Sequence, residues 1–255
     1  MVAGPPVADW RNADAYAALA HCDRHGFAWE WLRRSSSYRL TFDQTGGRRE
    51  QQDTGRFGLH RFEPPDLPWP IARLIWHRGV DDTVLTATAL PIGAAPAIDI
   101  RALNTIASYV ANRDGEHWLL ADRGNHVRID LVSGSLARGP VGLQFHVTGY
   151  PECRGQIAAL QRLVALSELG RWPTRSPRAE RRAPRWALIL RVHDAIVAGA
   201  SHREIAECLF DLGDLPRWRV SAPSWRRRVQ RLTDAARQFS RREPKAWLSA
   251  GRAQP

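Results

Sequence analysis

The pattern of apolar and polar positions divides the chain into three parts. In the first part, residues 9–62, apolar positions recur with a helical period from Ala13 to Ala20, and an aromatic segment begins at Phe27. The middle part, residues 63–170, is β-rich, with two helices and several strands. We predict the strands at 83–90, 117–121, 126–131 and 141–147, and the helices at 100–110 and 157–164. Residues 185–242 have a helical period apart from one loop.

Two consecutive helices are predicted at the start of the third part. The first carries an apolar face from Trp186 to Val197 and ends at Gly199, a residue favoured just beyond a helix. Ser201 and Glu204 have the spacing of a capping box, in which each side chain accepts a hydrogen bond from the other residue's amide. The second helix is therefore short and begins directly after Ser201.

A loop at 211–220 leads to a third helix, which we expect Ser221 to cap, with Pro223 in its first turn. Its apolar positions share one face of a helical wheel: Trp225, Val229, Leu232, Ala236 and Phe239. Arginine and glutamine occupy the opposite and flanking faces: Arg226, Arg227, Gln230, Arg231 and Arg237. The third helix is thus apolar beneath and basic outside.

The excess positive charge lies entirely in the last third of the chain. Residues 1–170 contain 18 basic and 18 acidic side chains, whereas residues 171–255 contain 19 basic and 8 acidic ones. This asymmetry indicates a polyanionic partner for the C-terminal part. Arginine supplies nearly all of the basic residues along the whole chain, so this preference carries little weight by itself.

These features predict a helix-turn-helix DNA-binding module in residues 171–255. An apolar underside anchors a recognition helix, and an Arg/Gln face can enter the major groove of double-stranded DNA. We expect base contacts from Ser224, Arg226, Arg227, Gln230 and Arg231. We expect phosphate contacts from Ser201, His202, Arg203, Arg219 and Arg228. The alternatives are a solvated basic helix without a binding role, or a segment that binds RNA or a membrane surface. The loop of about ten residues is also longer than the usual turn of a helix-turn-helix motif.

Two stretches resemble known families. The run from Trp10 through Tyr16 to Ala28-Trp29-Glu30-Trp31-Leu32-Arg33-Arg34 and Tyr38 resembles a proteobacterial transcriptional regulator-like domain. The run His202-Arg203-Glu204-Ile205-Ala206, with Leu209-Phe210, Trp218-Arg219 and Arg226-Arg227-Arg228-Val229, is similar to the DNA-binding domain of RovC-like type VI secretion transcription factors. FseA-type activators of integrative conjugative elements have the same two-part arrangement. The resemblance implies DNA binding and activation of mobile-element or secretion genes.

We therefore predict an α+β protein with a small helical N-terminal region (1–62), a β-rich middle region (63–170) and a helix-turn-helix-like DNA-binding domain (171–255). The predicted function is a sequence-specific bacterial transcriptional regulator. The alternative is a protein-interaction module, an antiactivator or adaptor, with only non-specific DNA affinity. We predict no enzyme, because no nucleophile–base arrangement or carboxylate pair is recognisable, and we assign no cofactor or metal.

Other candidate sites have simpler explanations. His21, Cys22 and His25 lack a fourth metal ligand, and His117, His126 and His146 on the predicted strands are expected in core or surface roles. We expect Trp29 and Trp31 to pack in the core, although an exposed ring would suit self-association or docking of another regulator. No apolar run approaches the roughly 20 residues of a membrane span, and no signal-like segment begins the chain, which predicts a cytoplasmic protein.

Overall fold

The computed structural model describes residues 8–47, 51–69, 71–93, 97–103, 105–122, 124–147, 149, 153–173, 179–210, 212 and 223–248. The chain forms two compact units. The helical unit combines residues 1–40 with residues 178–243, and the sheet unit combines residues 41–177 with residues 244–255. No helix among the described residues is long and apolar enough to cross a membrane.

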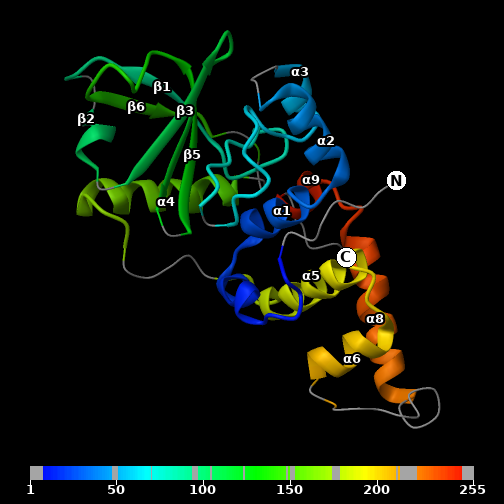
Figure 1. The fold of residues 1–255 in the computed structure, drawn as a ribbon. Helices are drawn as coiled ribbons and strands as arrows, with labels where there is room; N and C mark the ends of the chain where they lie inside the picture. The colour runs from blue at the N-terminus through cyan, green and yellow to red at the C-terminus, as the bar shows by residue number, and fades with distance from the viewer. Residues whose placement is uncertain are drawn as a thin grey trace. The chain divides into compact units, whose positions relative to one another are not determined.

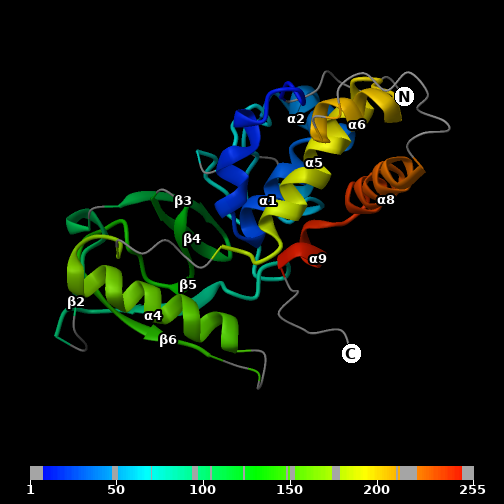
Figure 2. The same ribbon diagram turned by 90° about the horizontal axis from the view of Figure 1, so that it is seen from below.

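A six-stranded mixed sheet forms the sheet unit. Its strands are β1 (Leu85–Leu90), β2 (Ala97–Ile98), β3 (Ile106–Asn112), β4 (Gly115–Asp122), β5 (Asn125–Ser133) and β6 (Val141–Phe145). Their order across the sheet is β2-β6-β1-β5-β4-β3, and β1 runs parallel to β5 (Figure 1). The helix α4 (Arg154–Leu169) lies along one face, as Figure 2 shows from below. The short helices α3 (Gln51–Gly55) and α9 (Pro244–Leu248) also belong to this unit.

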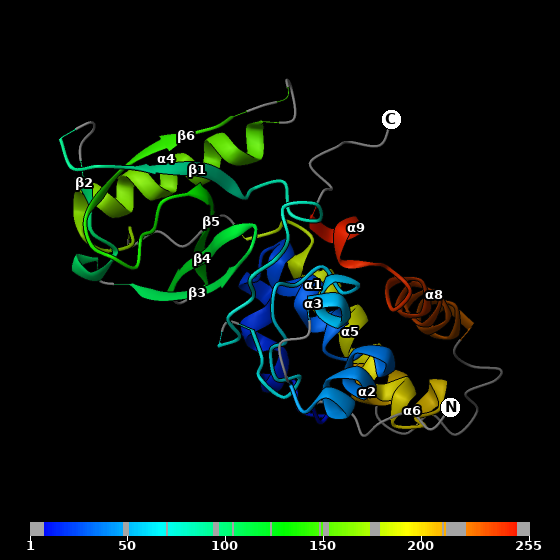
Figure 3. The same cartoon turned by 90° about the horizontal axis from the view of Figure 1, so that it is seen from above.

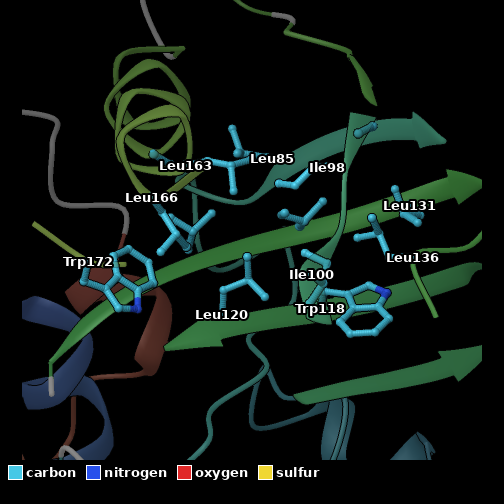
Figure 4. Close-up of a cluster of buried hydrophobic side chains, with 14 residues drawn as sticks. Leu85, Ile98, Ile100, Trp118, Leu120, Leu131, Leu136, Leu163, Leu166 and Trp172 are labelled. Carbon is cyan, nitrogen blue, oxygen red and sulfur yellow. The ribbon is translucent and has the colours of Figure 1, made fainter. Parts of the chain in front are cut away.

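The main core of the sheet unit lies between α4 and the sheet. Leu163 and Leu166 of α4 point toward Leu85 and Leu120 of the strands (Figure 4). Trp172, which follows α4, is buried in the same cluster, and its indole nitrogen donates to the Thr105 hydroxyl at 2.8 Å. Apolar and polar residues alternate along β5, where Val127, Ile129 and Leu131 belong to this core. Residues 118–121 of β4 are all apolar, so β4 contributes Trp118 and Leu120 to this core, and Leu119 and Ala121 to a smaller apolar cluster on its other face.

The opposite face of the same strands buries polar groups. Arg128 of β5 is fully buried and donates hydrogen bonds to the carbonyl oxygens of Trp76 and Trp118 and to the Asp130 carboxylate. Burial lowers the pKa of Arg128, although Asp130 opposes the shift. Because three acceptors surround the guanidinium, its burial is compensated by hydrogen bonds.

The helical unit combines an N-terminal and a C-terminal segment, residues 1–40 and 178–243. It contains the 3₁₀ helix η1 (Asp14–His21), the helices α1 (Arg24–Leu32), α5 (Ala183–Val197), α6 (His202–Phe210) and α8 (Pro223–Phe239), and the start of α2 (Ser36–Thr45). The ring of Phe27 on α1 meets Trp186 of α5 edge-on at 5.2 Å, and Trp31 meets Phe239 of α8 at 5.9 Å. Figure 3 shows α1 beside α5.

The predicted fold class is confirmed, with a helical N-terminus, a β-rich middle and a helical C-terminal region. The strands near 83–90, 117–121, 126–131 and 141–147 and the helix near 157–164 are all present. The helix predicted at 100–110 is wrong. That segment forms only a 3₁₀ turn at Ile100–Ala102 and then β3, because β3 pairs with β4 from Ile106 to Asn112.

The compact units do not follow the three-part division at residues 62 and 170. The reason is that the N-terminal helices cover the apolar side of α5 rather than forming a core of their own. Trp29 and Trp31 are both buried, so the alternative of an exposed ring for partner docking is wrong.

Candidate nucleic-acid interface

The helices α5 and α6 are joined by a short turn whose geometry the local sequence determines. Gly199 has a φ of 78°, a left-handed conformation that favours glycine. The Ser201 amide donates to the Glu204 carboxylate at 2.7 Å, and the Glu204 amide donates to the Ser201 hydroxyl at 3.3 Å. The predicted capping box is therefore confirmed. The hydrogen bonds from Ser201 lower the pKa of Glu204, because they favour the charged carboxylate.

The helix α8 has sharply different faces. Its apolar side is buried, through Val229, Leu232, Ala236 and Phe239, as the helical period predicts. On a helical wheel, the stripe farthest from these residues contains Arg227, Gln230, Arg231, Asp234 and Gln238, all of them exposed. This outer stripe of α8 is a candidate surface for recognition in the helical unit.

The remaining expected base contacts lie beside this stripe. Ser224 is exposed in the first turn of α8, and Arg226 is exposed on the flank of the helix that also carries Arg237. Arg227 donates from Nε to the Pro223 carbonyl oxygen at 3.4 Å, so its guanidinium lies back along the first turn.

Arg228 occupies the other flank and stacks on aromatic rings. Its guanidinium carbon lies 4.3 Å from the centre of the Phe210 ring and 5.1 Å from that of Trp225. The centres of these two rings lie 4.8 Å apart, and the ring contact joins the end of α6 to the start of α8. Stacking of this kind fixes the plane of a guanidinium but leaves its N–H donors accessible at the edge.

The expected phosphate contacts on α6 lie at its N-terminus. Ser201 is exposed, and His202 and Arg203 are half-buried. Arg203 forms an ion pair with Glu207 one turn later, with Nε 2.6 Å from Oε1. Arg219, together with the expected cap Ser221, lies outside the described residues.

A buried ionic network supports α5 from the N-terminal side. The Arg34 guanidinium donates from Nε and Nη2 to the two oxygens of Asp194, each at 2.8 Å, and the Tyr16 hydroxyl donates to the same carboxylate at 2.7 Å. The Glu30 carboxylate accepts hydrogen bonds from the guanidinium groups of Arg34 and Arg33, and the bond from Arg33 is 2.8 Å long. We call these five residues the Arg34–Asp194 network.

The pKa shifts within the network differ: the pKa of Arg34 and of Tyr16 is raised, whereas burial lowers that of Arg33 against the effect of Glu30. Burial alone would lower the pKa of Arg34, but the charges and hydrogen bonds of Glu30 and Asp194 outweigh burial and raise it. Burial and the Asp194 carboxylate raise the pKa of Tyr16. The raised pKa keeps Arg34 charged beside its two carboxylate partners, and these contacts, with that of Tyr16, hold α1 and η1 against α5.

Comparison with protein families identifies both ends of the chain. Residues 147–244 match the family model of a T6SS transcription factor DNA-binding domain, of the RovC type. The chain carries a RovC-like DNA-binding domain. Residues 9–61 match the proteobacterial transcriptional regulator-like domain, so the resemblance in both stretches is confirmed. Both matched families are transcription-regulator domains rather than enzyme families. No curated protein matches the chain in sequence.

The matched ranges and the compact units divide the chain differently. The RovC-like DNA-binding domain includes α4, which packs on the sheet, as well as α5, α6 and α8 of the helical unit. The exposed basic face of α8 lies inside the matched DNA-binding domain. The Arg34–Asp194 network, in contrast, takes four of its five residues from the N-terminal domain and only Asp194 from the DNA-binding domain. No local sequence signal marks this network, because Tyr16 and Arg34 lie 178 and 160 positions from Asp194 in the chain.

A histidine cluster in the sheet unit is the other candidate site. His60, His117 and Asp130 are buried, with possible ligand atoms within 4.8 Å of one another. The rings of His60 and His117 stack with their centres 3.6 Å apart and their planes at an angle of 21°. The His60 ring also stacks on His77, with 3.7 Å between the ring centres. A metal ion lies in the plane of each imidazole that binds it, so nearly parallel stacked rings do not direct their lone pairs to one point. Arg128 adds a positive charge 2.9 Å from the Asp130 carboxylate, and we assign no metal here.

Burial dominates the protonation of this cluster. It lowers the pKa of His60 to about 3, with a further contribution from the neighbouring His77 and His117, and it also lowers the pKa of His77. In the sheet register His117 lies opposite Asp130, whereas His126 lies opposite Ala121, so these two histidines are not neighbours. His146 is exposed and bonds to the Thr88 hydroxyl.

Proposed function

We propose that this protein is a sequence-specific DNA-binding transcriptional regulator that places α8 in the major groove of double-stranded DNA. The observation that carries the proposal is the division of α8 into a buried apolar face and an exposed Arg/Gln face, on a helix that follows the capped α6 within a DNA-binding family match. Arginine can form a paired hydrogen bond with guanine and glutamine with adenine. No observation favours the alternative of a protein-interaction module.

The roles of individual residues follow from their positions. Base contacts are proposed for residues that α8 exposes: Ser224, Arg226, Arg227, Gln230 and Arg231. Phosphate contacts are proposed for the start of α6, the flank of α8 and one residue outside the described part of the chain: Ser201, His202, Arg203, Arg228 and Arg219. The aromatic stacking of Arg228 supports a phosphate role, since it orients the guanidinium before DNA arrives.

The first experiment is a fluorescence-anisotropy titration of the full chain against its own upstream DNA and a scrambled duplex, over a salt series. Both affinities should fall with salt, because phosphate contacts release counterions. A preference of about a thousandfold or more for one duplex supports a specific regulator. Equal and steeply salt-dependent binding to every duplex, including those selected from a random library, contradicts it.

Two arginine variants locate the recognition face. Arg227→Ala and Arg231→Ala should each weaken operator binding by about 1–3 kcal/mol and relax the preference at one base position. Arg113→Ala removes an equal charge from the exposed turn between β3 and β4, and it should leave the preference unchanged. Unchanged operator affinity in both α8 variants would contradict the assignment of α8.

The target genes and the functional segments are also proposals. The family description supports control of secretion genes, and we propose activation of secretion or mobile-element genes, with action in the bacterial cytoplasm. A promoter–reporter assay with and without the protein tests the direction: increased reporter activity supports activation and decreased activity contradicts it. We retain 1–62, 63–170 and 171–255 as proposed functional segments, although they differ from the compact units.

A further inference from the structure

An acidic side chain lies in the middle of the basic outer stripe of α8. Asp234 is the one acidic residue among the 17 residues of this helix, and its side chain is 59% exposed. It lies one turn beyond Arg231 and Gln230, opposite to the buried Leu232 and Ala236. A carboxylate at this position points away from the core of the unit.

The contacts of Asp234 occupy one of its two oxygens. The Gln230 amide donates from Nε2 to Oδ1 at 3.0 Å, and Arg237 donates from Nη1 to the same oxygen at 3.4 Å. Among the described residues, no donor contacts Oδ2. The carboxylate therefore holds the Gln230 amide in place and keeps a free acceptor.

Helix stability alone gives little reason for this residue. Aspartate is a weak helix former in a helix interior, and exposed pairs at this spacing stabilise a helix only slightly. On a helix that approaches DNA, its charge also opposes binding to every duplex, because it repels the phosphates. A carboxylate in the major groove gains a favourable contact where it accepts a hydrogen bond from the amino group of cytosine.

We propose that Asp234 determines specificity: Oδ2 accepts a hydrogen bond from the exocyclic amino group of one cytosine in the operator, next to the base that Gln230 contacts. This inference rests on the proposed function, since it requires α8 to lie in the major groove. It adds discrimination by repulsion to discrimination by attraction, because the carboxylate repels the phosphates of every duplex, and only a duplex with the cytosine gains a hydrogen bond in return.

The inference predicts opposite effects on the two kinds of DNA. Asp234→Asn removes the charge and keeps the shape of the side chain. Binding to a scrambled duplex should tighten several-fold, whereas binding to the operator should weaken, so that their ratio falls by about fivefold to a hundredfold. Glu243→Gln makes the same change of charge at an exposed residue just beyond α8, and it should leave the ratio unchanged.

The decisive measurement is a base-substitution scan of the operator, selected from a random library, with the wild type and Asp234→Asn. Substitution of one C·G pair should weaken binding of the wild type but leave binding of the variant unchanged. Substitutions at the other positions should weaken binding of both proteins to the same extent. Thermal unfolding checks that the exposed substitution leaves the fold intact. Equal tightening on both duplexes, or an unchanged base profile, overturns the role of Asp234 alone. Failure of the wild type to discriminate between any duplexes overturns the proposed function, and this inference with it.

Discussion

Replacing Asp194 by alanine tests whether the Arg34–Asp194 network stabilises the helical unit. The substitution removes the acceptor of three hydrogen bonds, two from Arg34 and one from Tyr16. The side chains of Arg34 and Asp194 are 4% and 2% exposed, so water cannot replace the lost acceptor without rearrangement. The four charges of Glu30, Arg33, Arg34 and Asp194 cancel, whereas the variant keeps one uncompensated positive charge.

The magnitude follows from the cost of an unpaired buried charge. Removing one partner of a buried ion pair typically costs about 3–5 kcal/mol. A whole domain is stable by only about 5–15 kcal/mol, so the change removes a large fraction of the stability of the helical unit. The Tyr16 hydroxyl, also left without its acceptor, adds to the cost.

Native-state hydrogen exchange of the amides in α5 and η1 measures this effect in the helical unit by itself. The most protected amides of α5 should exchange through an opening that is about 3–5 kcal/mol easier in the variant. Amides of β4 and β5 in the sheet unit provide an internal reference. DNA affinity should fall as well, because α8 packs on α5 and α6 packs on α8.

A double variant separates pairing from simple loss of packing. In Arg34→Met/Asp194→Ala, Glu30 and Arg33 remain as a neutral pair. The double variant should therefore be more stable than Asp194→Ala, with a coupling of about 0.5–3 kcal/mol in the cycle. Additive effects, or a cost below about 1 kcal/mol for Asp194→Ala, would refute the reasoning.

Three further predictions concern acid stability and the backbone. Below about pH 6.5 His60 is protonated in the unfolded chain, whereas in the native state its pKa of about 3 keeps it neutral. Lowering the pH to about 5 should therefore reduce the free energy of unfolding by about 2 kcal/mol, as measured by urea titration. His60→Phe should lose much of this dependence, and an unchanged slope contradicts it. Gly115→Ala should destabilise the sheet unit by about 2 kcal/mol or more, since φ is 125° and a Cβ would overlap a carbonyl of β5. Gly93 also has a positive φ but has open space around it, so Gly93→Ala controls for backbone strain alone. Equal shifts of the unfolding temperature in the two variants would refute the overlap. Ser201→Ala should cost about 1 kcal/mol by removing the cap of the Glu204 amide, and unchanged thermal stability would contradict this.

The sequence by itself determined the features that depend on neighbouring residues. The capping box of Ser201 and Glu204 and the end of α5 at Gly199 require only a few consecutive residues. The buried face of α8 follows from its helical period in the same way. Most strands of the sheet unit were also predictable, because their apolar runs are short and bounded by turns.

The tertiary structure decided the features that depend on distant residues. The apolar spacing from Ile100 to Val110 fits a helix, but pairing with β4 makes the second half a strand, since sheet hydrogen bonds outweigh a weak local preference. Arg34 and Asp194 are 160 positions apart in the chain. Their charges look like those of solvated residues until the packing of α1 on α5 removes the water around them. Periodicity shows which face of each helix is apolar, but only the fold determines which helix covers it and which charges become buried partners.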